Sequence, residues 1–455
     1  MCRLLVVVGL ILGSAVTHSA GADEAAFLSA GTLRVGLGST GQVVSLYDAV
    51  QKKEYFPSGK SAPLLSLVLA DKTVRPTALS YDKAKSRLKL AYGEGGITAT
   101  VNVAFKPTHV TLELASVEGA RPTKIHWGPL PTTVNETVGA VIGVVRNDAV
   151  AIGIQSLNIQ TVAGASGRSQ SRHGGRDAPR APAGGVSLLF AYAIEHDGGV
   201  KGSKIALFGC PAQRALATIG RIELAEGLPH PMLDGEWGKI SPTARLSYFI
   251  VGYGENNMDE VLEVAAKGGF KYAYHPGPFQ TWGHFKLHPG PFPHGDASLV
   301  RCSEKAAKAG VRLGIHTLTG FITPNDPYVT PVPDPRLARL GSSTLTGAVD
   351  EKAVEIPVAD PTVFRTRQTL STVIIGRELV EYQAVSGSAP WKLSGCQRGA
   401  FGTAASAHSA GADIGKLADH AYRTFYPGIE NGMLDEMTGR LVELGNKAKL
   451  RQISF

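Results

Sequence analysis

The sequence lacks the cysteine pattern of a disulfide-stapled fold. It has only 4 cysteines in 455 residues, and none forms a Cys-x-x-Cys pair. Cys2 precedes an apolar N-terminal run, which leaves Cys210, Cys302 and Cys396 at distant spacings. An odd number of widely separated cysteines does not build a disulfide framework. We therefore expect buried thiols, with one bridge at most.

Several catalytic and cofactor motifs are also missing. No HExxH, GxSxG, P-loop or dinucleotide fingerprint occurs where a strand–turn–helix would make it credible. The sequence therefore predicts no cofactor, and it offers no ordered set of metal ligands.

Long apolar runs are confined to the N-terminus. Arg3 precedes the apolar stretch 4–16, and Ala20-Gly-Ala supplies the small residues that a signal peptidase accepts. This is the pattern of a secretory signal at 1–22, and it is too short to span a membrane. We expect a secreted or periplasmic protein with no membrane segment.

The charge balance gives little support for nucleic-acid binding. The net charge is +8, but Arg168, Arg172, Arg176 and Arg180 fall in one Gly/Ser-rich segment with Asp177. Without that segment the excess is about +5, an ordinary surface balance. A nucleic acid is therefore not an expected partner, whereas an anionic polysaccharide stays open.

Residues 23–245 have the pattern of an antiparallel β-sandwich. Alternating stretches such as Arg87-Leu-Lys-Leu-Ala-Tyr and Val110-Thr-Leu-Glu-Leu recur every 10 to 20 residues between Gly, Pro and Asp turns. No convincing amphipathic helix interrupts them. The segment 163–185 is interpreted as a mobile surface loop of this domain.

From residue 246 the pattern changes to alternating strands and helices. Leu246-Ser-Tyr-Phe-Ile-Val predicts a buried strand, 258–267 a helix, Phe270-Lys-Tyr-Ala-Tyr a strand, 297–309 a helix, and Val311-Arg-Leu-Gly-Ile-His the next strand. This rhythm indicates a parallel sheet or barrel over 246–330. Residues 331–415 return to short strands and are predicted to be a small inserted β domain. The remainder, 416–455, contains a helix at 429–447 and a tail in which we expect no further buried strand.

The loop after the 270–274 strand is the richest in chemically active side chains. His275, His284, His288 and His294 lie there with Trp282. In a barrel, residues at the carboxyl ends of strands face the active site. Because His275 closes one strand and His316 closes the next, we expect both at one mouth. The Trp282 ring is suited to stacking on a sugar.

Two carboxylate-bearing segments complete the candidates. Asp326 is the carboxylate expected near the same mouth, although an Asn-Asp-Pro sequence also favours a turn. Asp234-Gly-Glu-Trp reads as a turn rather than as a ligand site. The predicted substrate-binding residues are Tyr274, His275, Trp282, His284, His316 and Asp326, with no metal site and no catalytic residue assigned.

The order of these parts resembles a known group of enzymes. The stretch 270–317 contains Phe292-Pro-His-Gly, then a helix, then Gly310-Val-Arg-Leu-Gly-Ile-His. With a galactose-mutarotase-like sandwich in front of it, this arrangement looks like the N-terminal part of the α-galactosidase and α-glucosidase glycoside hydrolases. The resemblance implies a (β/α)8 barrel whose nucleophile and acid follow later strands. Here His275 stands where that group often has acidic residues.

The chain looks truncated against that pattern. Without the insertion, residues 246–455 leave about 125 positions, half of the roughly 250 in a full barrel. The predicted fold is therefore a β-sandwich followed by an incomplete (β/α) barrel with an inserted small β domain. The resemblance implies a secreted carbohydrate-active protein, the inactive N-terminal part of a glycoside hydrolase. Whether this chain is an enzyme stays open, and the alternatives are a non-catalytic carbohydrate-binding protein or a polysaccharide lyase with a His or Tyr base.

Overall fold

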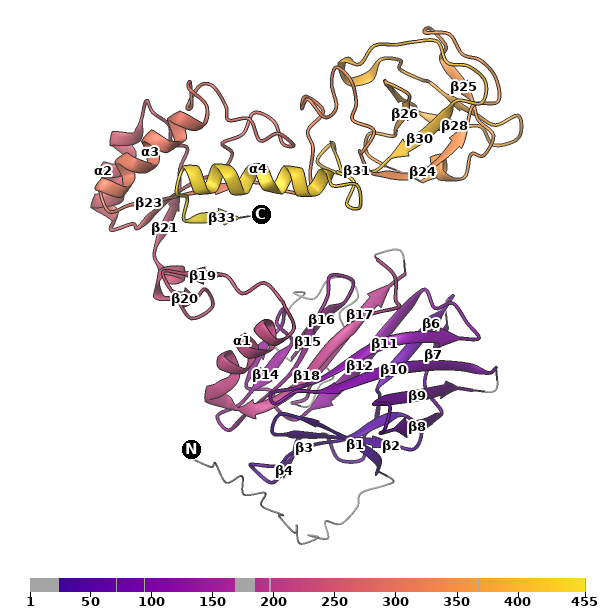
Figure 1. Cartoon of the computed structure of the whole chain (residues 1–455), viewed down its shortest axis with the longest axis vertical. Helices are drawn as coiled ribbons and strands as arrows, with labels where there is room; N and C mark the ends of the chain where they lie inside the picture. Colours follow the sequence, from indigo (N-terminus) through magenta and orange to yellow (C-terminus); the bar gives the residue numbers. More distant parts are fainter. Residues whose placement is uncertain are drawn as a thin grey trace, which may run out of the picture. The chain divides into compact units, whose positions relative to one another are not determined.

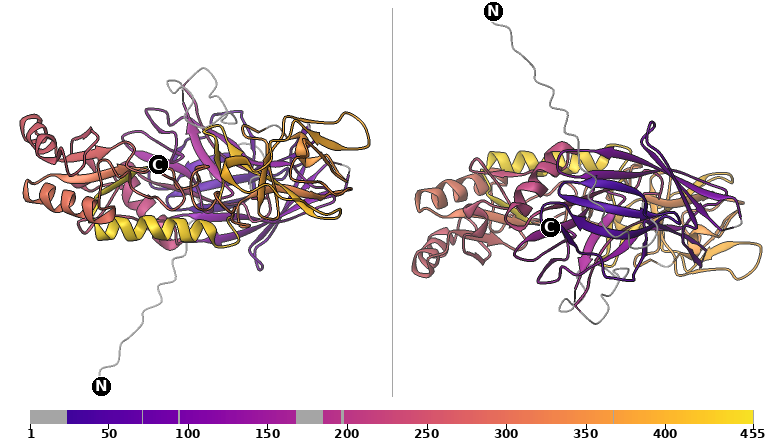
Figure 2. Two further views of the ribbon diagram at one scale, coloured as in Figure 1. Left: turned by 90° about the horizontal axis from the view of Figure 1, so that it is seen from above. Right: turned by 90° about the horizontal axis from the view of Figure 1, so that it is seen from below.

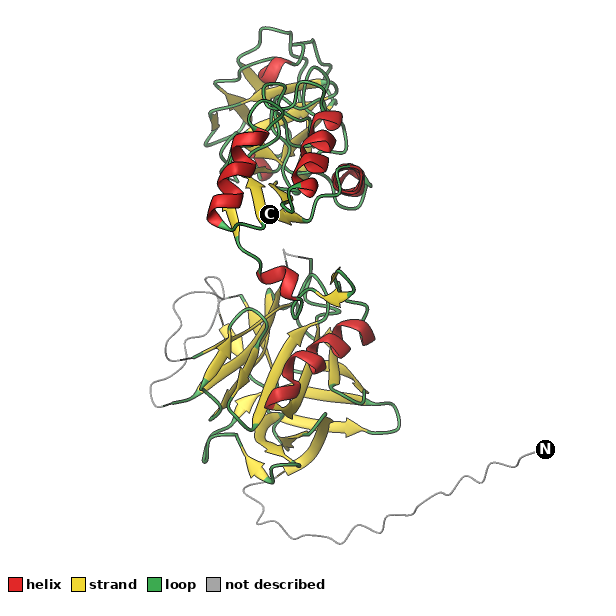
Figure 3. Cartoon of the chain, turned by 90° about the vertical axis from the view of Figure 1, so that its left-hand side faces the viewer, coloured by secondary structure: helices red, strands yellow, loops and turns green. Residues whose placement is uncertain are grey.

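The computed structural model describes residues 24–70, 72–93, 95–167, 185–195, 198–366 and 368–454. The predicted signal peptide and the four arginines of the 163–185 segment lie outside these residues. The chain divides into two compact units, Met1–Ala244 and Arg245–Phe455. Figure 3 shows the contrast in their make-up, because strands fill the first unit and most of the helices belong to the second.

Three larger antiparallel sheets and one two-stranded hairpin build the described part of the first unit (Figure 1). The largest has eight strands in the spatial order β13(Thr137–Gly139), β14(Val144–Arg146), β15(Val150–Ser156), β18(Lys204–Pro211), β11(Val110–Glu118), β10(Ile97–Phe105), β9(Arg87–Tyr92), β8(Ala78–Asp82). A five-stranded sheet has the order β16(Val162–Ser166), β17(Ser187–Ile194), β12(Lys124–Thr132), β6(Leu65–Leu69), β7(Lys72–Val74). The third sheet contains β1(Glu24–Ala30), β2(Leu33–Gly38), β3(Gln42–Asp48), β4(Lys53–Glu54) and β5(Ala62–Pro63).

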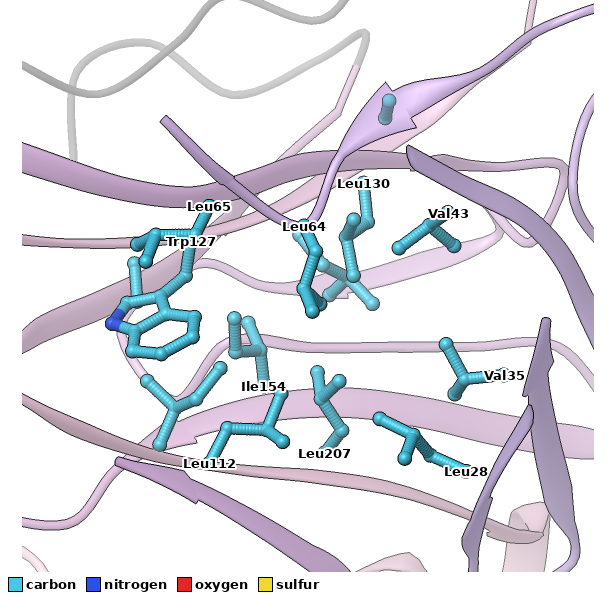
Figure 4. Close-up of a cluster of buried hydrophobic side chains, with 14 of the residues drawn as sticks. Leu28, Val35, Val43, Leu64, Leu65, Leu112, Trp127, Leu130, Ile154 and Leu207 are labelled. Atoms are coloured by element: carbon cyan, nitrogen blue, oxygen red, sulfur yellow. The ribbon is translucent and has the colours of Figure 1, made fainter. Parts of the chain in front are cut away.

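The alternation that predicted these strands also builds the core. Leu112, Ile154 and Leu207 point inward from the eight-stranded sheet and meet Leu65 and Trp127 from the five-stranded sheet (Figure 4). The Trp127 Nε1 donates to Ser203 Oγ at 3.0 Å, which satisfies the one polar atom of that ring. The predicted antiparallel sandwich is confirmed.

One helix of this unit was not predicted. The helix α1(Ala215–Ala225) follows the short 3-10 helix η1(Ala212–Arg214) and covers the outer face of β18, where Ile219 and Ile222 pack against Phe208. Its N-cap residue, Arg214, makes no side-chain capping bond, so the usual start signal is absent. The hairpin β19(Met232–Leu233)–β20(Glu236–Trp237) turns at Asp234-Gly235, as the sequence indicated.

The second unit contains a parallel sheet in the order β21(Tyr248–Ile250), β22(Tyr272–His275), β23(Arg312–His316), β33(Gln452–Ser454). The helices α2(Met258–Gly268), α3(Asp296–Lys308) and α4(Met433–Lys447) accompany it. The predicted βα units are thus present, and Gly269 and Gly310 follow α2 and α3 with φ of +68° and +71°. Asn257 precedes α2 without a side-chain capping bond.

One sequence prediction fails in this sheet, and another is incomplete. The tail, in which no further buried strand was expected, contains the three-residue strand β33, which is half-buried and pairs in parallel with β23. The β21 segment is not buried, since Tyr248 is 52% and Ile250 62% exposed. Tyr248 and Ile250 share one exposed face of β21, an edge strand among the described residues, whereas Phe249 on the other face packs against the cluster under the sheet.

The insertion forms two small sheets. One has the order β24(Arg339–Thr344), β30(Asp413–Leu417), β26(Thr372–Ile375), β27(Glu378–Glu381), and the other β25(Glu355–Pro357), β29(Lys392–Ser394), β28(Ala384–Val385). A hairpin β31(Asp419–His420)–β32(Thr424–Phe425) leads out of it. The remaining 3-10 helices are η2(Pro242–Arg245), η3(Val363–Arg365) and η4(Ala400–Gly402).

The helix α4 connects the parts of the second unit. Its Met433, Met437 and Leu441 pack with loop residues that include Phe285, whereas Leu444 packs in the cluster under the parallel sheet. Figure 2 shows α4 in yellow running along this unit from the helices toward the insertion. In the part of the chain that the structure describes, no helix is long and apolar enough to cross a membrane. Cys210, Cys302 and Cys396 are buried free thiols.

Candidate functional site

The carboxyl edge of the parallel sheet carries the predicted site residues on two different faces. His275 pairs with Ile315 in the register of β22 and β23, and His316 pairs with Ser454 in that of β23 and β33. Paired residues of neighbouring strands share a face, and successive residues alternate. His275 therefore lies on the same face as Ile315, and His316 on the opposite face with Tyr274 and Ser454. Both histidines lie at the carboxyl edge of the sheet, but they face opposite sides of it and not the common mouth that was predicted.

Tyr274, His316 and Ser454 form a cluster that we call the edge triad. The Tyr274 hydroxyl and the Ser454 hydroxyl share a hydrogen bond. The His316 Nδ1 lies 3.5 Å from the Ser454 Oγ, and the Tyr274 and His316 ring centroids are 6.4 Å apart. A phenol, an alcohol and an imidazole side by side can donate and accept several hydrogen bonds at once. That combination suits a ligand rich in hydroxyl groups.

His275 is enclosed on the helix side of the sheet. It is 7% exposed, and its ring lies 5.1 Å from that of Tyr253 and 5.7 Å from that of Phe292. Burial lowers the pKa of His275 from 6.5 to about 4, so the ring is neutral at physiological pH. Its Nδ1 accepts the Gly277 N–H at 3.1 Å, which places the proton on Nε2. This environment fits a structural histidine of the core.

His284 and Asp326 come together as a pair. The His284 Nδ1 lies 2.7 Å from the Asp326 Oδ1, and the His284 N–H donates to Oδ2 at 2.9 Å. Asp326 is fully buried, accepts the Tyr328 N–H as well, and lies so close to Gly283 that a Cβ there would meet its Oδ1 at 2.6 Å. The carboxylate therefore holds the ring with Nε2 directed away, while the Tyr328 ring supports it at 4.0 Å.

The other residues of the loop have separate partners. The His294 Nδ1 lies 3.3 Å from the Glu255 Oε2, and the exposed His288 accepts the Gly290 N–H. The Trp282 ring is partly buried against the cluster around α4, and its backbone N–H donates to Thr323 Oγ1. Within the described ranges no three His, Cys, Asp or Glu side chains converge as a metal site.

An aromatic cluster that the sequence analysis missed lies beyond the end of β23. Phe321, in the loop after β23, has its ring centroid 4.6 Å from that of His420 and 5.4 Å from that of Tyr426. Tyr422 completes the cluster, 4.7 Å from His420, and is 64% exposed. Ile322 and Phe425 exchange backbone hydrogen bonds, which fixes the loop against the 419–426 hairpin. The run Asp419-His-Ala-Tyr-Arg-Thr-Phe-Tyr was the available signal.

The first carboxylate after each of the strands β21, β22 and β23 forms an ion pair or hydrogen bond with another side chain. Glu255 is the first acid after β21 and pairs with Arg301, while Asp296 is the first after β22 and accepts two bonds from Arg440 at 2.7 and 3.0 Å. Asp326, the first after β23, holds His284. A glycosidase needs two carboxylates placed on either side of the bond that it breaks. Each of these three instead has a structural partner.

Comparison with known proteins finds a likeness to solved structures alone. No family model matches the chain, and no curated protein matches it in sequence. Solved structures do match. Several of them are glycoside hydrolases. The α-N-acetylgalactosaminidase NagBb from Bifidobacterium bifidum, in complex with GalNAc, aligns with a TM-score of 0.42 at 10% identity, over 69% of this chain and 62% of that one.

Two α-galactosidases match in the same way. The enzyme from Lactobacillus brevis gives a TM-score of 0.38 at 8% identity, over 94% of this chain and 62% of that one. The GH36 enzyme AgaA from Geobacillus stearothermophilus gives 0.34 at 11% identity, over 69% and 58%. The chain thus spans about three fifths of the length of these structures, and the predicted resemblance is confirmed as structural similarity. At TM-scores of this size, the likeness identifies no activity.

Proposed function

We propose that this chain is an exported, glycoside hydrolase-like protein that binds a saccharide at the carboxyl edge of its parallel sheet without hydrolysing it. The observation that carries the proposal is the aromatic cluster of Phe321, His420, Tyr422 and Tyr426 in the segments that follow β23 and β30, in which Tyr422 is exposed and the other three rings are half-buried. Aromatic rings with a polar edge, held by a rigid scaffold, suit the alternating apolar and polar faces of a sugar ring.

The edge triad supports the same proposal. It holds two hydroxyl groups and one imidazole together on the sheet face opposite α2 and α3, where Tyr274 is buried and His316 and Ser454 are half-buried. Phe321 follows His316 by only five positions. Hydroxyl and imidazole groups can match the hydroxyls of a sugar in either hydrogen-bonding sense. A carbohydrate therefore fits this edge better than an apolar or a highly charged ligand.

The state of the carboxylates supports binding without hydrolysis. Glu255, Asp296 and Asp326 each have a cationic or imidazole partner, which fixes their orientation within the loops. An acid that donates a proton to a leaving group must be free to reach the substrate. The fixed state of these three carboxylates therefore favours saccharide binding over hydrolysis.

The closeness of Tyr274 and His316 favours a second candidate, a polysaccharide lyase. In such a reaction a side-chain base removes the proton beside a uronic acid carboxylate, the glycosidic oxygen leaves with its electron pair, and a carbon–carbon double bond forms. That product absorbs ultraviolet light, whereas simple binding yields no product.

One experiment separates these functions. The full chain is titrated calorimetrically with p-nitrophenyl α-D-galactopyranoside, GalNAc and maltotriose, and the mixtures are then assayed for p-nitrophenol. A uronate polymer is incubated in parallel and its ultraviolet absorbance followed. The proposal expects heat of binding with at least one saccharide and neither product. Release of p-nitrophenol contradicts the non-hydrolytic assignment, ultraviolet product establishes the lyase, and no binding to any saccharide refutes the proposal.

A further inference from the structure

The first unit contains a cleft that none of the carboxyl-edge residues lines. It has a volume of about 480 Å³ and opens on the outer side of the five-stranded sheet. Its floor includes Ser66, His126, Leu188 and Phe190, which alternate along β6, β12 and β17 with the core residues behind them. Lys60 and Arg75 belong to its lining and are exposed to solvent. This volume lies within the usual range for small-molecule sites.

A backbone irregularity shapes this cleft. The register of β12 with β17 shifts between Trp127 and Leu130, and both residues of the bulge, Gly128 and Pro129, line the cleft. Gly128 has a φ of +79°, and a Cβ at that position would lie 2.6 Å from the Leu130 N. Only glycine is tolerated there without displacement of the backbone. Bulges of this kind re-aim side chains and are over-represented beside functional sites.

The electrostatics of the cleft are one-sided. Lys60, Arg75 and His126 line it, and none of the described lining residues carries a carboxylate. Among the described residues, neither Lys60 nor Arg75 takes part in a salt bridge, in contrast to Lys204, which pairs with Glu226 elsewhere in the unit. Two unpaired cations over an apolar and hydroxyl-bearing floor attract an anion. They do so without the cost of breaking an existing ion pair.

We propose that this cleft binds an acidic saccharide. The Arg75 guanidinium can hold a carboxylate or a sulfate ester through two parallel hydrogen bonds, and Lys60 adds a second positive charge. Phe190 offers an apolar floor for the sugar ring, and Ser66 and His126 offer hydrogen-bonding groups to its hydroxyls. The site lies in the sandwich, so it does not depend on the aromatic cluster of the second unit.

The test compares matched charges on the ligand and on the protein. The full chain is titrated calorimetrically with digalacturonate, with its methyl ester, and with a sulfated galactose disaccharide. The double variant Lys60→Gln/Arg75→Gln removes the two cleft cations. The control variant Arg87→Gln/Lys89→Gln removes the same charge from exposed positions on β9, in another sheet. Circular dichroism checks that all three proteins are folded.

The proposal predicts that digalacturonate binds the wild-type chain and that the cleft variant weakens this binding about tenfold or more. The control variant should change it less than about twofold, since neither Arg87 nor Lys89 lines the cleft and salt screens exposed charges that do not contact the ligand. Added salt should weaken digalacturonate binding in the wild-type chain. Binding of digalacturonate alone identifies a carboxylate as the anion, and binding of both acidic ligands identifies anionic sugars in general.

Three results overturn the proposal. The first is equal affinity for digalacturonate and its methyl ester, and the second is an equal effect of the cleft and control variants. The third is the absence of binding to both acidic ligands. A Tyr422→Ala variant separates this site from the carboxyl-edge proposal, because it should leave the digalacturonate affinity unchanged.

Discussion

The two compact units organise their interiors differently. The sandwich has one large apolar cluster between its sheets, with a smaller one beneath α1. The second unit has three clusters of similar size, one under the parallel sheet, one around the first half of α4 and one inside the insertion. The second unit also buries Asp326, Glu378 and Lys416 completely. In a unit with one core, we expect a core substitution to destabilise the whole unit. In a unit with several cores, we expect it to destabilise only the part that surrounds the altered core.

The largest expected effect therefore lies in the sandwich. Trp127→Ala removes the largest fully buried side chain among the described residues and deprives Ser203 Oγ of the hydrogen bond that the Trp127 ring donates. We expect a loss of about 3–5 kcal/mol in the free energy of unfolding. Hydrogen exchange followed by mass spectrometry should show faster exchange across both large sheets.

The matched change in the second unit is Leu393→Ala, in the core of the insertion. Faster exchange should then be confined to the insertion strands. Two results would contradict the difference between one large core and several separate cores. They are faster exchange throughout the second unit in Leu393→Ala, and faster exchange confined to the neighbourhood of β12 in Trp127→Ala.

The next effect concerns pH. His275 has its pKa lowered to about 4 by burial, against 6.5 in the unfolded chain. The unfolded state then binds more protons between these values, so stability falls as the pH drops from about 6.5 to about 4 and is fully present above that window. A shift of this size corresponds to about 3 kcal/mol at most.

Denaturant unfolding at pH 7 and pH 4.5 tests this for the wild-type chain, His275→Gln and His288→Gln. His275→Gln should flatten the dependence, whereas the exposed His288 of the same loop should leave it unchanged. An identical slope in all three proteins would show that His275 is not the buried neutral group described above.

A smaller loss is expected at Asp326. Asp326→Asn keeps the shape but replaces an acceptor oxygen with an NH2 group, which leaves one of the Asp326 donors, His284 or Tyr328, without its partner. We expect a loss of about 1–3 kcal/mol, together with faster exchange in the loops around His284. Asp350→Asn, at an exposed turn of the insertion, is the control. Equal stability of Asp326→Asn and Asp350→Asn would show that the Asp326 hydrogen bonds do not stabilise the loop.

The smallest effect has the opposite sign. Lys416 is buried over the Tyr382 ring at 4.6 Å, and its Nζ has no hydrogen-bond partner among the described residues. Burial lowers the pKa of Lys416 from 10.5 to about 8, so the charged form destabilises the insertion at neutral pH and this cost fades as the pH rises through 8.

Lys416→Met should therefore stabilise the insertion by about 1 kcal/mol at pH 7, after allowance for imperfect packing. The exposed Lys352→Met serves as the control, and thermal unfolding at pH 7 and pH 9.5 is the measurement. A gain that is equal at both pH values, or a loss at pH 7, would contradict the account of a buried charge.

The sequence predicted the elements whose signals are local. Alternation in Arg87–Tyr92 and the glycines after α2 and α3 act within a few residues, and the structure follows them. The strand β33 has only three residues and becomes a strand through pairing with β23, more than a hundred positions away. Three residues are too few to show the alternation of a strand. The edge position of β21 also depends on the order of the strands in the sheet, which its own sequence does not reveal.

The site shows the same division between local and long-range information. The placement of Tyr274, His275 and His316 at strand ends follows from local pattern. Their division between two faces depends on the register of β22, β23 and β33, which the sequence does not display. The partnership of His284 with Asp326 joins two loops, and the aromatic cluster joins a loop to the hairpin after the insertion. Contacts of this kind need the fold before they can be seen.

The most direct test of the central claim is a titration of the full chain with the best saccharide of the panel, carried out for the wild type, Tyr422→Ala and Phe105→Ala. Tyr422 and Phe105 are both exposed aromatic side chains, but Phe105 lies on β10 of the sandwich. The account predicts that Tyr422→Ala lowers the affinity about tenfold or more while Phe105→Ala leaves it unchanged. Equal affinity of all three proteins would contradict saccharide binding at the carboxyl edge of the parallel sheet.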